Sequence, residues 1–266
     1  MNLLKIKIKR ALNRVLWKIH NYDENEHLDF LIKQKKTSTY PKVKSIEETI
    51  DKLIQENLSI ARYGDGEFML CFDRSIYFQQ KNRKLRNRLL DILQNMSNEK
   101  CLIALPEYRT ERLTTFWKKF WFENIKDLES ILHKNKIYYN QSITREIKLH
   151  EIEKLRQIWQ DRNVIFVLGK GSRFDFNHEL FSSVLSHDII YGLPLNAWNE
   201  YEKVLSEVKN RATEKLNPLV IAALGPAATV LAFDLSESGI QTLDLGHLTN
   251  VYDKLKYGKQ NPENLQ

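Results

Sequence analysis

The stretch that decides the fold reads Ser59-Ile60-Ala61-Arg62-Tyr63-Gly64-Asp65-Gly66-Glu67-Phe68. Its apolar first half, from Leu58 to Tyr63, predicts a buried strand, and the two glycines that follow predict a tight turn. Open α/β sheets bind their ligands where strands end. Asp65 and Glu67 place two carboxylates there, a set that suits a hard divalent cation sharing its other ligands with water and substrate phosphates.

Arg62 lies just before this turn and admits two interpretations. It could neutralise an anionic substrate, or it could pair with the neighbouring carboxylates. The simplest alternative for the whole segment is a polar surface turn stabilised by an arginine ion pair. An Asp-x-Glu triplet is short and common by chance, so further motifs are needed to distinguish a metal site from a surface turn.

Three further blocks follow in order along the chain. They are Val164 to Phe174 (VIFVLGKGSRF) with His178-Glu179-Leu180-Phe181, Leu219 to Leu235 (LVIAALGPAATVLAFDL), and Gln241 to His247 (QTLDLGH). Together with the Arg-Tyr-Gly-Asp-Gly-Glu block they resemble the GT-D glycosyltransferases, a family with an Asp-x-Glu metal motif. The matches span roughly Ser45 to Tyr252, and four ordered blocks are far more specific than one.

The resemblance implies a Rossmann-like α/β fold with a largely parallel sheet flanked by helices. Short β-rich runs that alternate with longer helical patterns favour the same fold class independently. By family analogy, the donor is a UDP-sugar, UDP-glucose or a related UDP-hexose. The acceptor is a sugar on a bacterial surface glycan or glycoprotein, or a lipid-linked sugar. The cofactor implied is Mn²⁺ or Mg²⁺.

The resemblance also assigns roles to particular residues. Asp65 and Glu67 would hold the metal, and Arg62 joins them as a catalytic residue that stabilises the charge developing on the donor diphosphate. The residues that would bind the nucleotide sugar are Arg62, Gly64, Arg145, Ser172, Arg173, Gly225, Pro226 and His247. Arg145 follows Asn140 in a segment that resembles the family only partly.

Two strand-to-loop junctions support this assignment. After Leu168, the loop Gly169-Lys170-Gly171-Ser172-Arg173 offers a hydroxyl and two cations, which suit a diphosphate. After Leu224, Gly225-Pro226 predicts a helix start with free amides above the sheet. Both loops could equally be ordinary βα connections. Neither matches a Walker A or Gly-x-Gly-x-x-Gly pattern, which disfavours an ATPase or a dinucleotide enzyme.

The closing block departs from the family. Where the family commonly has two acids after Gly-His, this chain has Thr249 and Val251. A base or metal role of those acids therefore does not transfer. Acids that could compensate are Asp244, Asp253, Glu179 and Asp234. His247 could complete a metal shell or contact a donor phosphate, or it could be hydrogen-bonded structure.

Charge is unevenly distributed along the 266 residues. Six lysines and arginines and no acid lie in residues 1–20, so most of the net charge of +7 belongs to this segment. Apolar residues there recur at helical spacing and predict a basic amphipathic helix. Such a helix could contact an anionic membrane at its surface, or it could pack on the enzyme or a partner. We expect this helix and a polar, loosely packed lead-in over residues 1–43, one GT-D-like domain over 44–255 and a polar tail over 256–266.

An aromatic run and a basic run, each in a predicted helix, could serve either the structure or ligand binding. The aromatic run Phe116, Trp117, Phe120, Trp121 and Phe122 predicts the apolar face of a helix, although aromatic side chains also stack on sugar rings. The basic residues between Lys81 and Arg88 predict a solvated helix face, although they could bind a phosphate-bearing acceptor.

Cysteine usage and hydropathy bear on the compartment. Cys71 and Cys101 form no metal or redox spacing, so they are expected as buried thiols of a reducing compartment. No apolar run reaches membrane-spanning length, and no signal peptide is evident. We expect a cytoplasmic protein, with contact at the inner face of the plasma membrane through residues 1–20.

Two other function classes stay open at this stage. A metal-dependent phosphoryl-transfer or phosphohydrolase enzyme could use the same carboxylates. A non-catalytic membrane or nucleic-acid adaptor could use the basic segments, although no nucleic-acid partner is expected.

Overall fold

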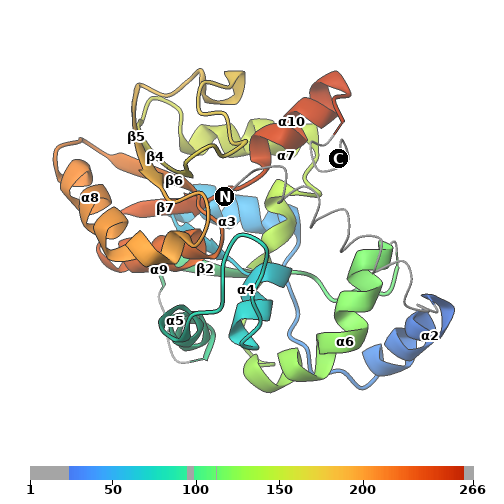
Figure 1. Cartoon of the computed structure of the whole chain (residues 1–266). Helices are drawn as coiled ribbons and strands as arrows, with labels where there is room; N and C mark the ends of the chain where they lie inside the picture. The colour runs from blue at the N-terminus through green and yellow to red at the C-terminus, as the bar shows by residue number, and fades with distance from the viewer. Residues whose placement is uncertain (1–23, 95–98, 112, 261–266) are drawn as a thin grey trace.

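The protein is built around one parallel sheet. A computed structural model describes residues 24–94, 99–111 and 113–260, and the basic segment 1–20 and the last residues of the tail lie outside this part. The strand order is β3-β2-β1-β7-β6-β4-β5, and every pairing is parallel. The Rossmann-like α/β fold class is thereby confirmed (Figure 1).

The strands are β1 (Ser59–Arg62), β2 (Cys101–Leu105), β3 (Tyr139–Asn140), β4 (Asn163–Gly169), β5 (Ser186–Gly192), β6 (Pro218–Ala223) and β7 (Gln241–Asp244). The α-helices are α2 (Glu24–Lys35), α3 (Ile46–Glu56), α4 (Asp65–Cys71), α5 (Arg83–Gln94), α6 (Thr115–Ile131), α7 (Leu149–Leu155), α8 (Tyr201–Thr213), α9 (Pro226–Glu237) and α10 (Leu248–Tyr257). Short 3₁₀ turns are η1 (Gln141–Thr144), η2 (Arg156–Ile158), η3 (Glu179–Phe181) and η4 (Ala197–Glu200).

The order of the strands creates a switch point between β1 and β7. The chain first lays β2 and β3 on one side of β1, then crosses over and fills the other side with β4 to β7. Ile60 of β1 is in register with Leu102 of β2 and with Leu243 of β7. In open α/β sheets, ligands bind beyond the carboxyl ends of the strands at such a point.

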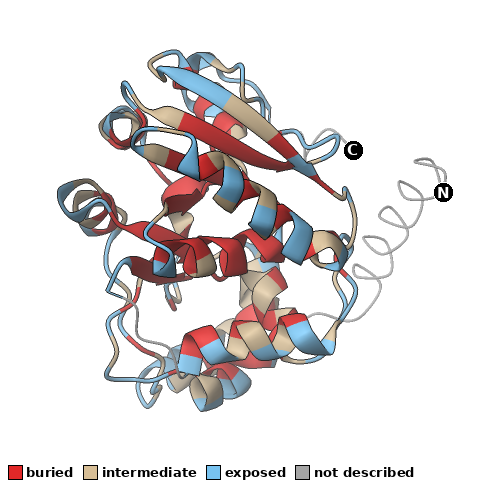
Figure 2. Ribbon diagram, turned by 90° about the vertical axis from the view of Figure 1, so that its left-hand side faces the viewer, coloured by how far each residue is buried: buried red, intermediate tan, exposed pale blue. Residues whose placement is uncertain are grey.

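Alternate strand residues feed two separate cores. Ile60, Phe166 and Ile221 face the layer that contains α3, α7 and α10, whereas Ala61 and Val167 face α9 and the helices beside it. Buried residues concentrate in the central layer, and exposed ones lie on the outer sides of the covering helices (Figure 2). Strands buried on both faces read as continuous apolar runs, as β2 and β4 do.

Helix ends follow the local sequence signals closely. The Ser45 hydroxyl accepts the Glu48 amide proton and the Glu48 carboxylate accepts the Ser45 amide proton, so the expected cap of α3 is confirmed. Pro226 occupies the first turn of α9, as expected. Cys71 and Cys101 are buried free thiols, and burial raises the pKa of each to about 12.

The chain turns from β1 into α4 without a left-handed residue, because Gly64 has an extended backbone and Asp65 already begins α4. Space is the constraint there instead: a Cβ on Gly66 would lie 3.1 Å from Ile76 Cδ1. The expected aromatic helix is α6, which begins at Thr115 with Thr114 as its N-cap.

The segment expected as a loose lead-in is packed from Glu24 onward. Helix α2 lies against α6, with Leu31 fully buried and its carbonyl accepting the Tyr108 hydroxyl. The Glu129 carboxylate of α6 also accepts hydrogen bonds from Ser38 and Thr39. Polar composition misled the prediction because one apolar stripe is enough to dock a helix.

Replacement of Leu31 tests whether α2 belongs to the folding unit. Leu31→Ala is expected to lower the free energy of unfolding by about 2–5 kcal/mol, because it leaves a cavity between α2 and α6. The neighbouring Ile32 is 43% exposed, so Ile32→Ala should cost less than about 1 kcal/mol. Urea unfolding followed by tryptophan fluorescence compares the two variants, and equal midpoints would contradict the packing described.

Candidate functional site

A buried ion pair joins the two halves of the sheet at the switch point. The Arg62 guanidinium, at the end of β1, contacts the Asp244 carboxylate of β7 with Nη2 to Oδ1 at 2.8 Å. The exposed fractions of the two side chains are only 10% and 8%. Arg62 Nε also donates to the Asp244 carbonyl at 2.6 Å. The carboxylate that Arg62 contacts is thus Asp244, 182 residues away, rather than the neighbouring Asp65 or Glu67.

The same guanidinium also holds the 3₁₀ turn that follows β3. Arg62 Nη1 donates to the Thr144 hydroxyl and, at 3.3 Å, to the Gln141 carbonyl. Sequence reasoning missed Gln141 and Thr144 as partners of Arg62. Their only signal is position, since η1 starts directly after a strand that ends at this edge.

The two motif carboxylates lie in the first turn of α4, directly after β1. Glu67 accepts the Gly64 amide at 2.7 Å, which fixes its side chain toward the strand end. Burial raises the pKa of Glu67 to about 7; the Gly64 hydrogen bond opposes the shift, and the charges of Asp244 and Asp65 add to it. Three carboxylates therefore act on one another here, with Arg62 bound to Asp244.

Two of the predicted nucleotide-sugar residues, Arg145 and His247, contact each other at this edge of the sheet. Arg145 follows η1, and His247 caps α10 in a left-handed conformation with a φ of 76°. Arg145 Nη2 donates to His247 Nε2 at 2.9 Å, so the imidazole accepts through this nitrogen. A cation and an imidazole thus lie next to the Arg62–Asp244 pair.

The other predicted residues belong to neighbouring strands. Gly225 and Pro226 follow β6, and Ser172 and Arg173 follow β4, which lies three strands from β1, about 14 Å at ordinary strand spacing. The Ser172 hydroxyl accepts the Phe174 amide at 3.1 Å. Arg173 is exposed and makes no ion pair within the described residues. These residues line the same edge of the sheet without contacting Asp65 or Glu67.

Phe78 covers the β6 junction in a way that the sequence did not indicate. A Cβ on Gly225, whose φ is 58°, would lie 2.9 Å from the Phe78 ring. The Phe78 carbonyl accepts the Asn196 amide, and the Asn196 side chain accepts the Gln80 amide, so this irregular loop is tied down across the sheet edge.

The acids that could replace the missing pair are all engaged. Asp244 binds Arg62, Asp253 binds His178 and Lys259, Glu179 binds Lys256 and Tyr257, and Asp234 binds Arg88 and Tyr201. Thr249 itself is buried in α10, and its hydroxyl has no partner among the described residues. The site therefore lacks an evident unpaired base on α10.

Three of the five basic side chains between Lys81 and Arg88 are engaged in the same way. Arg88 pairs with Asp234 and Glu237, Arg86 donates to the Cys71 carbonyl, and Lys81 pairs with Asp73. For these three residues the contacts favour the structural interpretation over a phosphate site, whereas Arg83 and Lys84 are exposed.

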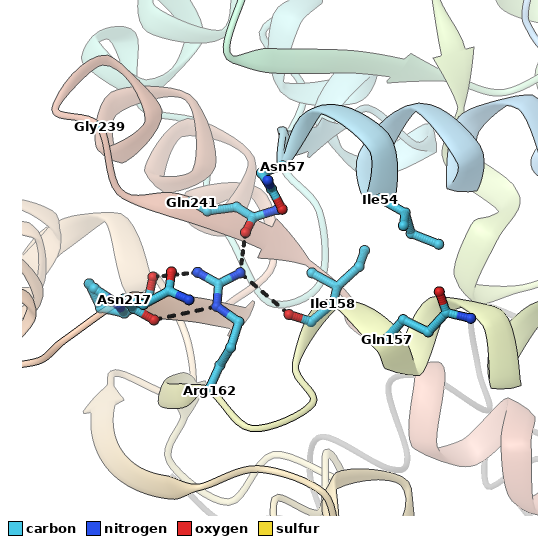
Figure 3. A pocket seen from close by; sticks show the side chains of 9 residues that line it. Ile54, Asn57, Gln157, Ile158, Arg162, Asn217, Gly239 and Gln241 are labelled. Carbon is cyan, nitrogen blue, oxygen red and sulfur yellow. Dashed lines mark hydrogen bonds between the residues drawn. The ribbon is translucent and has the colours of Figure 1, made fainter.

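A cavity lies at the opposite edge of the sheet, away from the motif. It measures about 480 Å³ and is lined by Arg162, Asn217 and Gln241 among others (Figure 3). The Arg162 guanidinium donates to the Pro218, Asn217 and Ile158 carbonyls and to the Gln241 side chain. These hydrogen bonds connect the starts of β4, β6 and β7. They also satisfy the Arg162 guanidinium without a ligand.

The described residues set limits on metal binding and on membrane insertion. No group of three or more histidines, cysteines, aspartates or glutamates is close enough to hold a metal by itself. A cation at Asp65 and Glu67 would therefore need further oxygens from water or substrate. None of the helices described combines the length and apolar character needed to cross a bilayer.

The fold is that of an α/β protein with a parallel sheet, and the candidate site lies at its switch point. Within that class, the model of the family described as "Glycosyltransferase GT-D fold" matches residues 60–265. The chain belongs to this family, and the resemblance seen in the motif blocks is confirmed.

Curated relatives agree with the family. A probable glycosyl transferase, Gly, of Streptococcus gordonii is 31% identical over 230 residues, covering 81% of this chain and 33% of the relative. Glycosyltransferase GlyD of Streptococcus pneumoniae serotype 4 is 31% identical over 229 residues, covering 81% and 28%. This chain thus spans about a third of the length of these relatives.

Solved structures agree as well. One described as a new glycosyltransferase (DUF1792) from Streptococcus sanguinis has a TM-score of 0.75 and 29% identity, covering 84% of this chain and 91% of its own. Another, described as a highly conserved domain of unknown function with a distinct glycosyltransferase fold, has a TM-score of 0.74 and 28% identity, covering 89% and 86%.

The Arg62–Asp244 pair is expected to carry a large part of the local stability. Arg62→Met should lower the free energy of unfolding by about 3–5 kcal/mol, because it leaves a buried carboxylate unpaired. Arg62→Met/Asp244→Leu should recover most of the loss. The control is Lys81→Met, which breaks a pair whose side chains are both 57% exposed and should cost less than about 1 kcal/mol. Urea unfolding measures all three, and a double variant no more stable than Arg62→Met would contradict this view.

Glu67 should make stability fall with rising pH in metal-free buffer. An unfolded glutamate loses its proton near pH 4.5 and the folded one near pH 7, so the native state loses stability between these values. Glu67→Gln removes this loss while keeping an acceptor for the Gly64 amide. The gain over wild type should be small at pH 4.5 and reach about 1–3 kcal/mol at pH 8.

Denaturant unfolding in EDTA at the two pH values measures the effect. Glu99→Gln is the control, because Glu99 is exposed and far from the motif in sequence. A pH-independent difference between wild type and Glu67→Gln would show that the Glu67 carboxyl titrates normally.

Proposed function

We propose that this chain is a metal-dependent glycosyltransferase that moves a hexose from a UDP-sugar to a sugar acceptor on a bacterial surface glycan or glycoprotein. The observation that carries the proposal is the meeting of Asp65, Glu67, Arg145 and His247 around the Arg62–Asp244 pair. In a chain with the GT-D fold, this arrangement combines carboxylates that could bind a metal ion with a basic side chain that could bind the donor diphosphate. UDP-glucose as donor rests on the family resemblance.

The residues present fit a hard divalent cation. Glu67 is partly buried beside Asp65 and Asp244, and its pKa is raised mainly by burial, with a further contribution from the charges of Asp244 and Asp65. A cation held by Asp65 and Glu67 would oppose this rise. When bound, Mn²⁺ or Mg²⁺ supplies Lewis-acid stabilisation of the negative charge on the departing diphosphate.

The cations of this edge would hold the rest of the donor. Arg145, kept in place by His247, lies where it could contact a phosphate beside the carboxylates. The N-terminal turn of α9, after Gly225, presents backbone amides at the same edge two strands away. Ser172 and Arg173, after β4, would bind the nucleotide part farther from the carboxylates.

Arg62 is best understood as a positioning residue. Its guanidinium already binds Asp244, Thr144 and the Gln141 carbonyl, so it holds the ends of β1, β7 and η1 in register. We therefore assign the stabilisation of the leaving group to Arg145 rather than to direct contact by Arg62.

The acceptor hydroxyl must lose its proton during transfer. Because the candidate acids outside the motif are all bound to cations or hydroxyls, none is assigned as the base.

We also propose that the protein is cytoplasmic and contacts the inner face of the membrane peripherally. This proposal rests on the basic pattern of residues 1–20.

A thermal-shift titration with UDP, GDP and CMP, each with and without Mn²⁺, tests the proposal. UDP with Mn²⁺ should raise the stability by about 2.7 kcal/mol at one hundred times its Kd, because it binds only the folded state. The shift should vanish in Asp65→Ala/Glu67→Ala.

The control double variant is Glu56→Ala/Glu214→Ala, which removes two exposed acids at helix ends near the opposite edge of the sheet. It should keep the full shift. A metal-independent shift with every nucleotide would favour a phosphohydrolase, and absence of any shift in folded protein would favour a non-catalytic adaptor.

A further inference from the structure

A second cavity lies on the same edge of the sheet, on the other side of the motif from β4 and β6. It measures about 320 Å³, at the small end of the range of about 300–1,000 Å³ for ligand pockets. Its walls come from the segments that follow β2 and β3 and from the first turns of α3, α6 and α7. The volume suits one small ring rather than a nucleotide.

The cavity touches the motif through one shared turn. Gln141 lines it, and the Gln141 carbonyl accepts Arg62 Nη1 at 3.3 Å. Since β2 is paired with β1 in register, the β2 end lies directly beside the strand that delivers Asp65 and Glu67. The carboxylates therefore lie between this cavity and the junctions after β6 and β4.

The lining has the chemistry of a carbohydrate site. Trp117 is partly exposed and offers an aromatic face, supported by Phe120 and Trp121 behind it. Glu107 is exposed and makes no hydrogen bond within the described residues. Gln141 Oε1 likewise accepts no described donor, although the residue is 8% exposed. Sugar hydroxyls are donors that such acceptors bind, and the C–H face of the ring packs on an indole.

The charge of the lining selects against phosphate. The lining contains four acidic residues and two basic ones: Glu47, Glu107, Glu146 and Glu151, and Arg109 and Lys148. Arg109 already donates to both Glu146 carboxylate oxygens at 2.6 Å. An anionic group would meet an excess of carboxylates here, whereas a neutral sugar would not.

We propose that this cavity binds the acceptor, and that the part it recognises is a neutral hexose or N-acetylhexosamine ring. The inference rests on the proposed glycosyltransferase function and adds the acceptor side to it. The donor enters over β7, β6 and β4, the acceptor sugar over β2 and β3, and the transfer takes place between them beside Asp65 and Glu67.

Ligand-observed NMR with defined sugars tests the inference. The probes are methyl β-glucoside, methyl β-galactoside and methyl N-acetyl-β-glucosaminide, with glucose 1-phosphate as the anionic counterpart. At least one neutral glycoside should bind the full chain, and glucose 1-phosphate should not compete with it. Binding should persist in Asp65→Ala/Glu67→Ala, because the cavity does not use the metal carboxylates.

Two matched pairs of variants locate the binding. Trp117→Leu and Glu107→Ala should each weaken the glycoside by about tenfold or more, the loss expected for one stacking face or one charged hydrogen bond. Phe116→Leu changes the next aromatic of α6, which is 48% exposed, and Glu111→Ala changes another exposed acid of the same loop. Neither lines the cavity, so both should stay within about twofold of wild type.

The result separates this inference from the proposed function. Thermal shift with UDP and Mn²⁺ should be unchanged in all four single variants, which also shows that each is folded. If UDP binds but no glycoside binds, or Trp117→Leu and Glu107→Ala bind glycosides like their controls, the acceptor assignment is wrong while the donor site stands. If glycosides bind as described and UDP does not, the cavity stands as a carbohydrate site and the donor proposal fails.

Discussion

The buried contact between Arg62 and Asp244 is the constraint on which this edge of the molecule depends. Neither ion is stable alone in a site of low exposure, so each requires the other and the hydrogen bonds around them. Because Arg62 also binds Thr144 and the Gln141 carbonyl, three segments far apart in sequence are held in one arrangement. Each of these segments is followed within a few residues by a candidate site residue: Asp65, Glu67, Arg145 or His247. The position of each segment therefore determines where these side chains lie.

Much of the fold could be predicted from local signals. The capping box of Ser45 and Glu48 marks α3, and the apolar runs at Cys101–Leu105 and Val164–Leu168 mark buried parallel strands. Helix α2 could not be predicted, because its stability comes from packing Leu31 against α6 rather than from its polar sequence. The edge strand β5 begins with Ser186-His187-Asp188, and these polar residues interrupt the apolar pattern by which a strand is predicted.

The candidate site was predictable in composition but not in contacts. The motif blocks place Asp65, Glu67, Arg145 and His247 after strands, and the structure gathers them at one edge. The partner of Arg62 lies 182 residues away, a distance at which no pattern in the sequence connects two side chains. Trp117 shows the same limit, since helical spacing assigns the aromatics of α6 to the core, while Trp117 and Trp121 also line a cavity.

The order of the strands separates the loops around Asp65 and Glu67 into two sets, which meet where Arg145 contacts His247 and where Arg62 holds the turn after β3. Loops after β2 and β3 precede β4 in the chain, and loops after β4, β6 and β7 come later. The ends of parallel strands tolerate substitution well, because their loops contribute little to the core. Over evolutionary time, one set can therefore diversify while the other is held by selection. Paralogues that arise by gene duplication would then differ along one half of this edge and remain alike along the other.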